Sequence, residues 1–219
     1  MKSWSVAALL SLALALPGAV SAQTLADYDY ENLAFRGIGV DFGAVWPAQV
    51  EPTLSFGVRA DMGYVGPHVR ISPAIRFWSS SLRVEEVERL ADQILLICEK
   101  QAAASCPSSL DLGEVDRSDL ELSVDAHYLF NTGYTISPYL GGGLGLHLLN
   151  GQGEFINGTF VEDLLDTIVP GVNAIAGLNI PLGESLQILA EARYVLVSDV
   201  RFGYLGVGGV WNLPTNSGQ

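Results

Sequence analysis

The feature that most constrains the fold is a two-residue alternation of apolar and polar side chains, which recurs in eight runs between residues 33 and 213. Residues at this spacing lie on one face of a β-strand. Each run reaches the roughly 9–11 residues that a tilted strand needs to cross a bilayer. The clearest run covers 53–64, and its apolar members are Leu54, Phe56, Val58, Ala60, Met62 and Tyr64.

The two faces of these runs differ in polarity, and this difference separates two kinds of barrel. One face is almost purely apolar, whereas the other mixes glycine with polar and charged residues. A soluble barrel of the lipocalin kind would enclose the apolar face. However, an eight-stranded barrel is only just wide enough inside for side chains, so eight sets of large apolar groups do not fit there. We therefore predict an all-β, antiparallel, up-and-down transmembrane barrel with a polar lumen, and the soluble barrel is the alternative.

The composition is consistent with this prediction. Hydrophobic residues make up 49% of the chain and charged residues only 16%, compared with about 25% charged in a typical soluble domain. No segment after the N-terminus approaches the roughly 20 apolar residues of a spanning helix. The net charge of −13 argues against nucleic acid as a partner.

The first 22 residues have the pattern of a secretory signal peptide. Lys2 precedes an apolar stretch at 6–16, and small residues at 20–22 form a cleavage site. We expect the mature chain to begin at Gln23. The expected organisation is a periplasmic segment at 23–32, a barrel at 33–213 and a tail at 214–219.

The connections between the runs alternate in length. Two long stretches, 79–118 and 150–168, fall on one side of the predicted barrel, and the turns on the other side are short. Outer-membrane barrels have this asymmetry, with the long loops outside the cell. We therefore expect the outer membrane of a diderm bacterium, with both termini in the periplasm.

The first long stretch contains an amphipathic helix at about 82–104, because its apolar residues recur at three- and four-residue spacing. We favour a cap that lays this apolar face over the barrel mouth or rim. The alternative is a surface for an extracellular partner or for lipid headgroups. Cys98 and Cys106 are predicted to form a disulfide, because an even cysteine count in an exported protein favours one over free thiols or a metal site.

The polar faces carry charges of both signs. We interpret them as a network of ion pairs that fills the narrow lumen, because a buried charge needs a partner; a gated path for ions is the alternative. Glycines on the inward faces of three strands would leave room for long arginine side chains. The residues of this predicted network are Asp41, Arg59, Asp61, Arg70, Arg76, Glu121, Asp125, Glu191 and Arg193.

The sequence offers little catalytic chemistry. His68 and His127 are expected to lie close together in the lumen as hydrogen-bonded residues, while His147 lies toward the opposite end. No nucleophile or metal motif is present, and we found no His–carboxylate or Ser–His set at a rim. We therefore expect no catalytic residue, metal or cofactor. Pro73 lies inside a predicted strand, where a proline removes a ladder hydrogen bond, and the sequence does not explain why it is tolerated there.

Three segments carry a family resemblance, GIGVDFGAVWP, SPYLGGGLGLHL and FGYLGVGGVWNL. Together with the eight runs, they resemble the small outer-membrane β-barrels of the OmpA/OmpX type. The resemblance implies the fold and the location but no activity. One departure is the C-terminus, which continues past Trp211 and Leu213 where such chains commonly finish on an aromatic residue.

The expected function is a non-enzymatic structural, envelope or surface-interaction role. The expected contacts are outer-membrane lipid or lipopolysaccharide and an extracellular partner at 79–118, with a monomer favoured. A narrow channel for small or hydrophobic solutes is the alternative, and a lipid-modifying enzyme is a weaker one.

Overall fold

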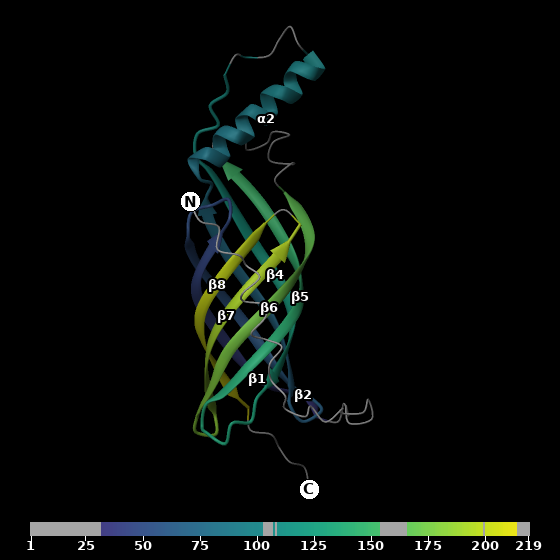
Figure 1. Cartoon of the computed structure of the whole chain (residues 1–219), viewed down its shortest axis with the longest axis vertical. Helices are drawn as coiled ribbons and strands as arrows, with labels where there is room; N and C mark the ends of the chain where they lie inside the picture. The colour runs from purple at the N-terminus through teal and green to yellow at the C-terminus, as the bar shows by residue number, and fades with distance from the viewer. Residues whose placement is uncertain (1–31, 103–106, 108, 154–165, 199, 214–219) are drawn as a thin grey trace, which may run out of the picture.

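The computed structural model describes residues 32–102, 107, 109–153, 166–198 and 200–213. Eight antiparallel strands form one closed barrel in which each strand pairs with its sequence neighbours and β1 pairs with β8 (Figure 1). This confirms the predicted fold class. The elements are β1 (Leu33–Pro47), β2 (Thr53–Val65), β3 (Val69–Ser81), α2 (Val84–Ala102), β4 (Val115–Leu129), β5 (Ser137–Gly153), β6 (Thr167–Leu182), β7 (Leu186–Val197) and β8 (Arg201–Asn212).

The strands near the helix extend further than the sequence predicts. The first long connection is 82–114, not 79–118, because β3 and β4 stay paired as far as Ser81 and Asp116. The predicted signal peptide, the segment up to residue 31, the tail at 214–219 and most of the second long loop lie outside the described residues. Those boundaries therefore remain predictions.

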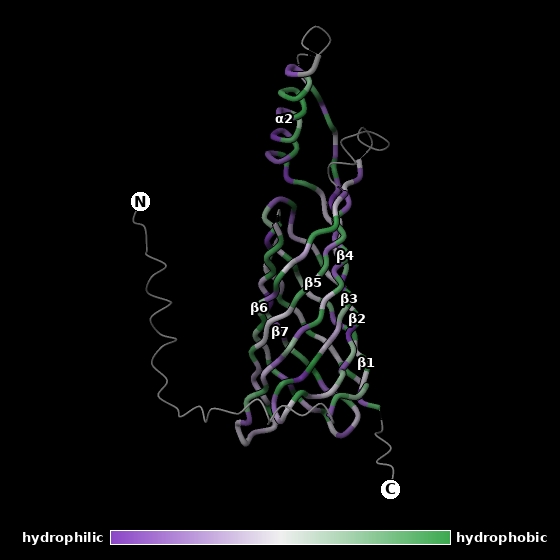
Figure 2. Tube along the Cα trace, turned by 90° about the vertical axis from the view of Figure 1, so that its right-hand side faces the viewer, coloured by the Kyte–Doolittle hydropathy of each residue, from purple (hydrophilic) through white to green (hydrophobic). Residues whose placement is uncertain are grey.

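The predicted orientation of the two faces is confirmed. Phe56 and Leu144 face outward and are 61% and 70% exposed, whereas Arg59 and Asp125 face inward and are 3% and 1% exposed. Figure 2 shows the same alternation as hydrophobic and hydrophilic colours that change along each strand. An apolar outer face over the whole barrel needs lipid around it, because in water it would be one very large exposed apolar patch.

Pro73 lies at an irregularity in the sheet. The pairing of β2 with β3 shifts by one residue between the pairs Arg59–Ala74 and Tyr64–Arg70, and Pro73 has no partner on β2 there. Proline removes one ladder hydrogen bond and is therefore confined to strand edges and bulges. The interrupted ladder explains why a proline is tolerated near the middle of β3.

The helix α2 projects from one end of the barrel, and the first and last described residues lie at the opposite end. Its apolar face packs on Leu112 of its own loop and on Val115 at the start of β4, and these residues form a buried cluster with Ala91 and Ile94. The prediction that the helix covers the barrel mouth is therefore wrong, whereas its contact with the strand end at Val115 agrees with packing against the rim. Among the described helices, none is long and apolar enough to span a membrane.

Candidate functional site

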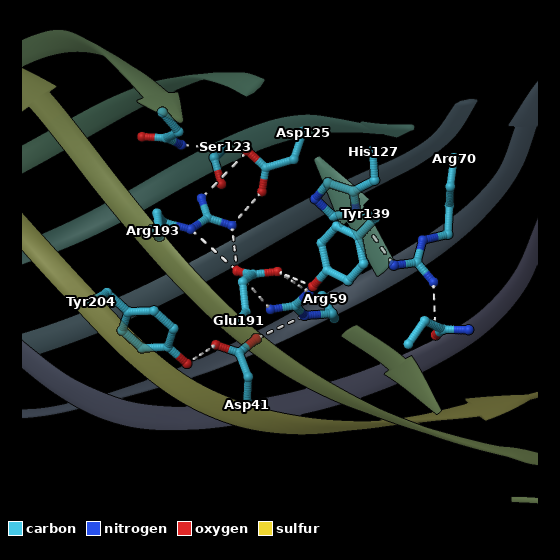
Figure 3. A network of polar contacts seen from close by, with 12 residues as sticks. Asp41, Arg59, Arg70, Ser123, Asp125, His127, Tyr139, Glu191, Arg193 and Tyr204 are labelled. Atoms are coloured by element: carbon cyan, nitrogen blue, oxygen red, sulfur yellow. Dashed lines mark hydrogen bonds and ion pairs between the residues drawn. The ribbon is translucent and has the colours of Figure 1, made fainter. Parts of the chain in front are cut away.

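The middle of the lumen holds a network of ion pairs centred on Glu191 of β7 (Figure 3). One carboxylate oxygen lies 3.1 Å from Arg59 Nη1, and the other lies 3.0 Å from Arg193 Nη2 and 3.8 Å from Arg76 Nη2. The Tyr139 hydroxyl also donates a hydrogen bond to Glu191, at 2.8 Å. A single carboxylate is therefore shared by three guanidinium groups from β2, β3 and β7.

Asp41 and Asp125 extend the network around the lumen wall. Asp41 lies 2.9 Å from Arg59 and 3.1 Å from Arg76, and Asp125 lies 2.7 Å from Arg193. Each of these side chains is buried. Such pairing compensates part of the desolvation penalty of each buried charge.

Glu121 is the fourth carboxylate and Arg70 is the fourth arginine in this part of the lumen. Glu121 lies 3.4 Å from Arg193. Arg70 donates to neutral acceptors, including Asn179 Oδ1 at 3.3 Å, and lies over the Tyr139 ring. The central part of the network thus contains four buried arginines, 59, 70, 76 and 193, and four buried carboxylates, 41, 121, 125 and 191, while Asp61, Arg117 and Asp119 are buried as well.

The structure brings most of the predicted charge set together but leaves two members apart. Arg70 is buried in the lumen, yet it forms no ion pair with a carboxylate of the described residues. Asp61 is also buried, and its Oδ1 accepts a hydrogen bond from the backbone N–H of Gly63 at 2.8 Å. Asp61 therefore stabilises the end of β2 locally and does not join the central pairs.

Apolar clusters close the lumen on both sides of this network. Toward α2, the loop residues Val50 and Val200 fold into the mouth and pack with side chains from the strand ends. Toward the chain ends, Tyr139 packs with Ile175, Leu189 and Val210. The outer cluster consists of Val45, Val50, Trp78, Leu149, Val195, Val200, Phe202 and Tyr204.

The sequence analysis missed these two seals. The available signal is the loss of strict alternation near strand ends, for example the consecutive apolar pair Leu148 and Leu149 in β5. Leu149 points into the outer cluster, while Leu148 faces outward. Leu149 is therefore an apolar residue on the otherwise polar inward face, and it fills the end of the lumen nearest α2.

Inward glycines provide the space that the network needs. A Cβ atom on Gly143 would overlap the Asp125 carboxylate, and one on Gly206 would overlap the Tyr204 hydroxyl. The expectation that such glycines leave room for lumen side chains therefore holds at these positions. The side chains that use the room are an aspartate and a tyrosine in place of the expected arginines.

The two histidines expected to meet are separated. His127 is fully buried and stacks on Tyr139, with 4.8 Å between the ring centroids. The His68 ring lies beside Tyr128, whose side chain is 42% exposed on the outer face. The structure therefore does not place His68 and His127 together in the lumen.

A different histidine, His147, pairs with a carboxylate. His147 Nδ1 lies 2.9 Å from Asp119 Oδ2, and both side chains have no solvent exposure. The pair lies beneath the outer apolar cluster, where Phe202 contacts the imidazole ring edge-on. Burial on all sides keeps lipid and water away, so the arrangement favours a structural role. No group of three or more metal-ligating side chains occurs in the described part of the chain.

Comparisons with known proteins identify the fold. No family model and no curated protein matches the chain. Among solved structures, Neisserial surface protein A is similar with a TM-score of 0.53 and 17% identity, over 81% of this chain and 97% of that one. The fold is that of the small eight-stranded outer-membrane β-barrels.

Two further outer-membrane barrels resemble the chain more distantly. The N-terminal barrel domain of Pseudomonas aeruginosa OprF has a TM-score of 0.47 and 13% identity, over 81% of this chain and 97% of that one. Ail of Yersinia pestis has a TM-score of 0.43 and 14% identity, over 83% and 99%. At these identities the comparisons support the fold alone.

Proposed function

We propose that this protein is a non-enzymatic outer-membrane barrel that anchors a helical arm, residues 82–114, on the cell surface for contact with an extracellular partner. The observation that carries the proposal is the sealed lumen. The barrel encloses a network of ion pairs between two apolar clusters, so its interior serves as a stable support and the exposed arm is the accessible part.

The position of the arm supports an anchoring role. It starts and ends on strands that are hydrogen-bonded to each other, since Leu82 N–H donates to Val115 O at 2.7 Å. Arg83 N–H donates to Gln49 O at 3.1 Å, and Arg117 Nη1 donates to the Gln49 side chain at 2.7 Å. These bonds fix the base of the arm to the barrel rim.

The surface of α2 supports a contact role. Val84 is 71% exposed and Leu96 is 54% exposed, beyond the end of the barrel. Apolar side chains in this position lie outside the lipid-facing belt, and exposed apolar groups of this kind mark interaction surfaces. The short turns at the opposite end, together with the predicted signal peptide, support periplasmic termini.

A narrow channel is the second candidate, and the charged residues that line the middle of the lumen favour it. Conduction would require displacement of the outer cluster around Trp78 and Phe202 as well as rupture of the ion pairs at Glu191. Because the outer cluster and the ion pairs both close the lumen, this arrangement contains no permanently open path.

Trypsin treatment of intact cells followed by bilayer recording of the purified protein tests the proposal. We expect cleavage within the arm, at Arg83, Arg89 or Lys100, while the barrel fragments stay resistant. We also expect the full-length protein to give no conductance steps. A matched variant, Phe202→Ala with Val50→Gly, thins the outer cluster and tests whether the remaining ion pairs at Glu191 keep the lumen closed on their own.

Each readout has a result that contradicts the proposal. An arm that resists trypsin on intact cells but is cleaved after outer-membrane permeabilisation would place it in the periplasm. Regular single-channel steps from the unmodified protein would favour the channel instead.

A further inference from the structure

The outer cluster contains a buried carboxylate. Asp119 of β4 pairs in register with Trp78 of β3 and with Leu149 of β5, and both of these neighbours belong to the cluster. The Asp119 side chain has no solvent exposure. Because an ionised carboxylate in apolar surroundings needs a counter-charge, this position requires a cation from the adjacent layer of the lumen.

His147 of β5 occupies the place of that cation. Its Nδ1 atom lies 2.9 Å from Asp119 Oδ2. The carboxylates of the central network pair with arginines instead. Gly171 of β6 makes room for the imidazole, since a Cβ atom there would lie 2.6 Å from His147 Nε2. The absence of a side chain at position 171 therefore allows the ring to reach Asp119.

The count of buried charges favours one proton on this pair. Six carboxylates and five arginines are buried among the described residues. A proton shared by His147 and Asp119 gives this set equal numbers of positive and negative charges, whereas loss of the proton leaves one negative charge in excess. That excess charge would lie within the outer cluster, where its burial is costly. The carboxylates are 41, 61, 119, 121, 125 and 191, and the arginines are 59, 70, 76, 117 and 193.

The other charged groups that face His147 largely cancel each other. Glu121 of β4 pairs in register with His147, and Arg193 of β7 acts on the ring from across the lumen. These two groups form an ion pair with each other at 3.4 Å. The neighbours of the ring on β6 and β8 are Gly171 and Phe202, which do not titrate. The shared proton is therefore the charge at this layer that changes near neutral pH.

We propose that the proton shared by His147 and Asp119 keeps the outer seal of the lumen closed, and that the seal loosens as the pH rises above neutral. Loss of the proton leaves Asp119 ionised without a counter-charge. Water reaches this carboxylate only when Trp78 and Phe202 are displaced, because both lie in the cluster around it.

The direction of the pH dependence follows from the two states of the seal. A solvated histidine has a pKa of about 6.5, so an opened seal releases the proton above that pH while the closed seal retains it. Release of one proton shifts the ratio of closed to open seals by up to about tenfold per pH unit. The contribution of the pair is therefore complete below about pH 6.5 and falls as the pH rises.

A cysteine at position 195 reports the state of the seal, because Val195 is fully buried in the outer cluster and pairs in register with Phe202. We would measure how fast a small methanethiosulfonate reagent labels Val195→Cys in the full-length protein in nanodiscs, where both ends of the barrel are accessible. Division by the rate at Glu184→Cys, an exposed turn position, removes the pH dependence of thiol reactivity itself. Peptide mass spectrometry identifies the labelled residue.

We expect the normalised rate at position 195 to rise at least about tenfold between pH 7 and pH 9. Asp119→Asn should stay slow at both pH values, because asparagine still accepts a hydrogen bond from His147 and leaves no charge to solvate. His147→Asn removes the counter-charge at every pH and should label fast already at pH 7. The matched control is His127→Asn, since His127 is also buried in the lumen but stacks on Tyr139, and this variant should keep the rise.

Two results would overturn the proposal: a rate at position 195 that does not change with pH in the otherwise unmodified barrel, or the same rise in Asp119→Asn. Heat-modifiable mobility of each variant shows that the barrel has folded. The inference goes beyond the role of the helical arm and does not depend on it. Resistance of the arm to trypsin on intact cells would contradict the proposed function and leave these rates unchanged.

Discussion

Replacing Glu191 with glutamine removes the charge that three arginine side chains share, while the volume of the side chain stays almost the same. The shortest distances from the carboxylate oxygens to the nitrogens of Arg193, Arg59 and Arg76 are 3.0, 3.1 and 3.8 Å. At an effective dielectric constant of about 20, each close contact contributes roughly 4–6 kcal/mol of attraction. The sum overestimates the effect, because burial of the carboxylate also costs several kcal/mol per ion.

The net loss for one partner removed from a buried ion pair is about 3–5 kcal/mol, and we expect Glu191→Gln to fall in that range. Glutamine can still accept the hydrogen bond from Tyr139, so the loss reports the charge and not the hydroxyl contact. Asp41 contacts two arginines, so Asp41→Asn should cost less than Glu191→Gln.

Urea-induced unfolding in phospholipid vesicles, followed by tryptophan fluorescence, measures this free energy. Glu184→Gln is the matched control, because Glu184 lies exposed in the turn between β6 and β7, where substitutions change stability by about 0.5 kcal/mol or less. If Glu191→Gln and Glu184→Gln unfold at the same urea concentration, the central pairs contribute no net stability and the reasoning fails.

Two further predictions concern packing and redox state. Gly143→Ala should destabilise the barrel by about 1–3 kcal/mol, because its Cβ overlaps Asp125. Gly209→Ala is the control and should be neutral in the same unfolding assay, because Gly209 is at an outward position and its Cβ would have its nearest atoms at 3.9 Å. Cys98 and Cys106 should resist alkylation until a reductant is added, when the intact mass increases by two adducts; labelling without reductant would contradict the predicted disulfide.

Much of the architecture could be predicted because a two-residue period reports directly which face a side chain occupies. Arg59 and Asp125 were predicted inward on that basis, and both are buried in the lumen. The helix at 84–102 was likewise predictable from its spacing. Its position could not be predicted, because an amphipathic pattern shows only that one face of the helix is covered. Here that face is covered by Leu112 of the same loop and by Val115 at the start of β4.

The sequence by itself therefore determined the number of strands, the lipid-facing and lumen-facing residues, and the charges that the lumen must hold. Which charges meet was decided by the tertiary structure. Arg59 and Glu191 are separated by 132 residues and meet across the lumen, at heights set by the stagger of the closed sheet. The same stagger places His147 beside Asp119 and directs Leu149 into the mouth. The two-residue alternation decides whether a side chain points into or out of the barrel. The closure of the barrel decides how far an inward side chain lies from the residue with which it pairs.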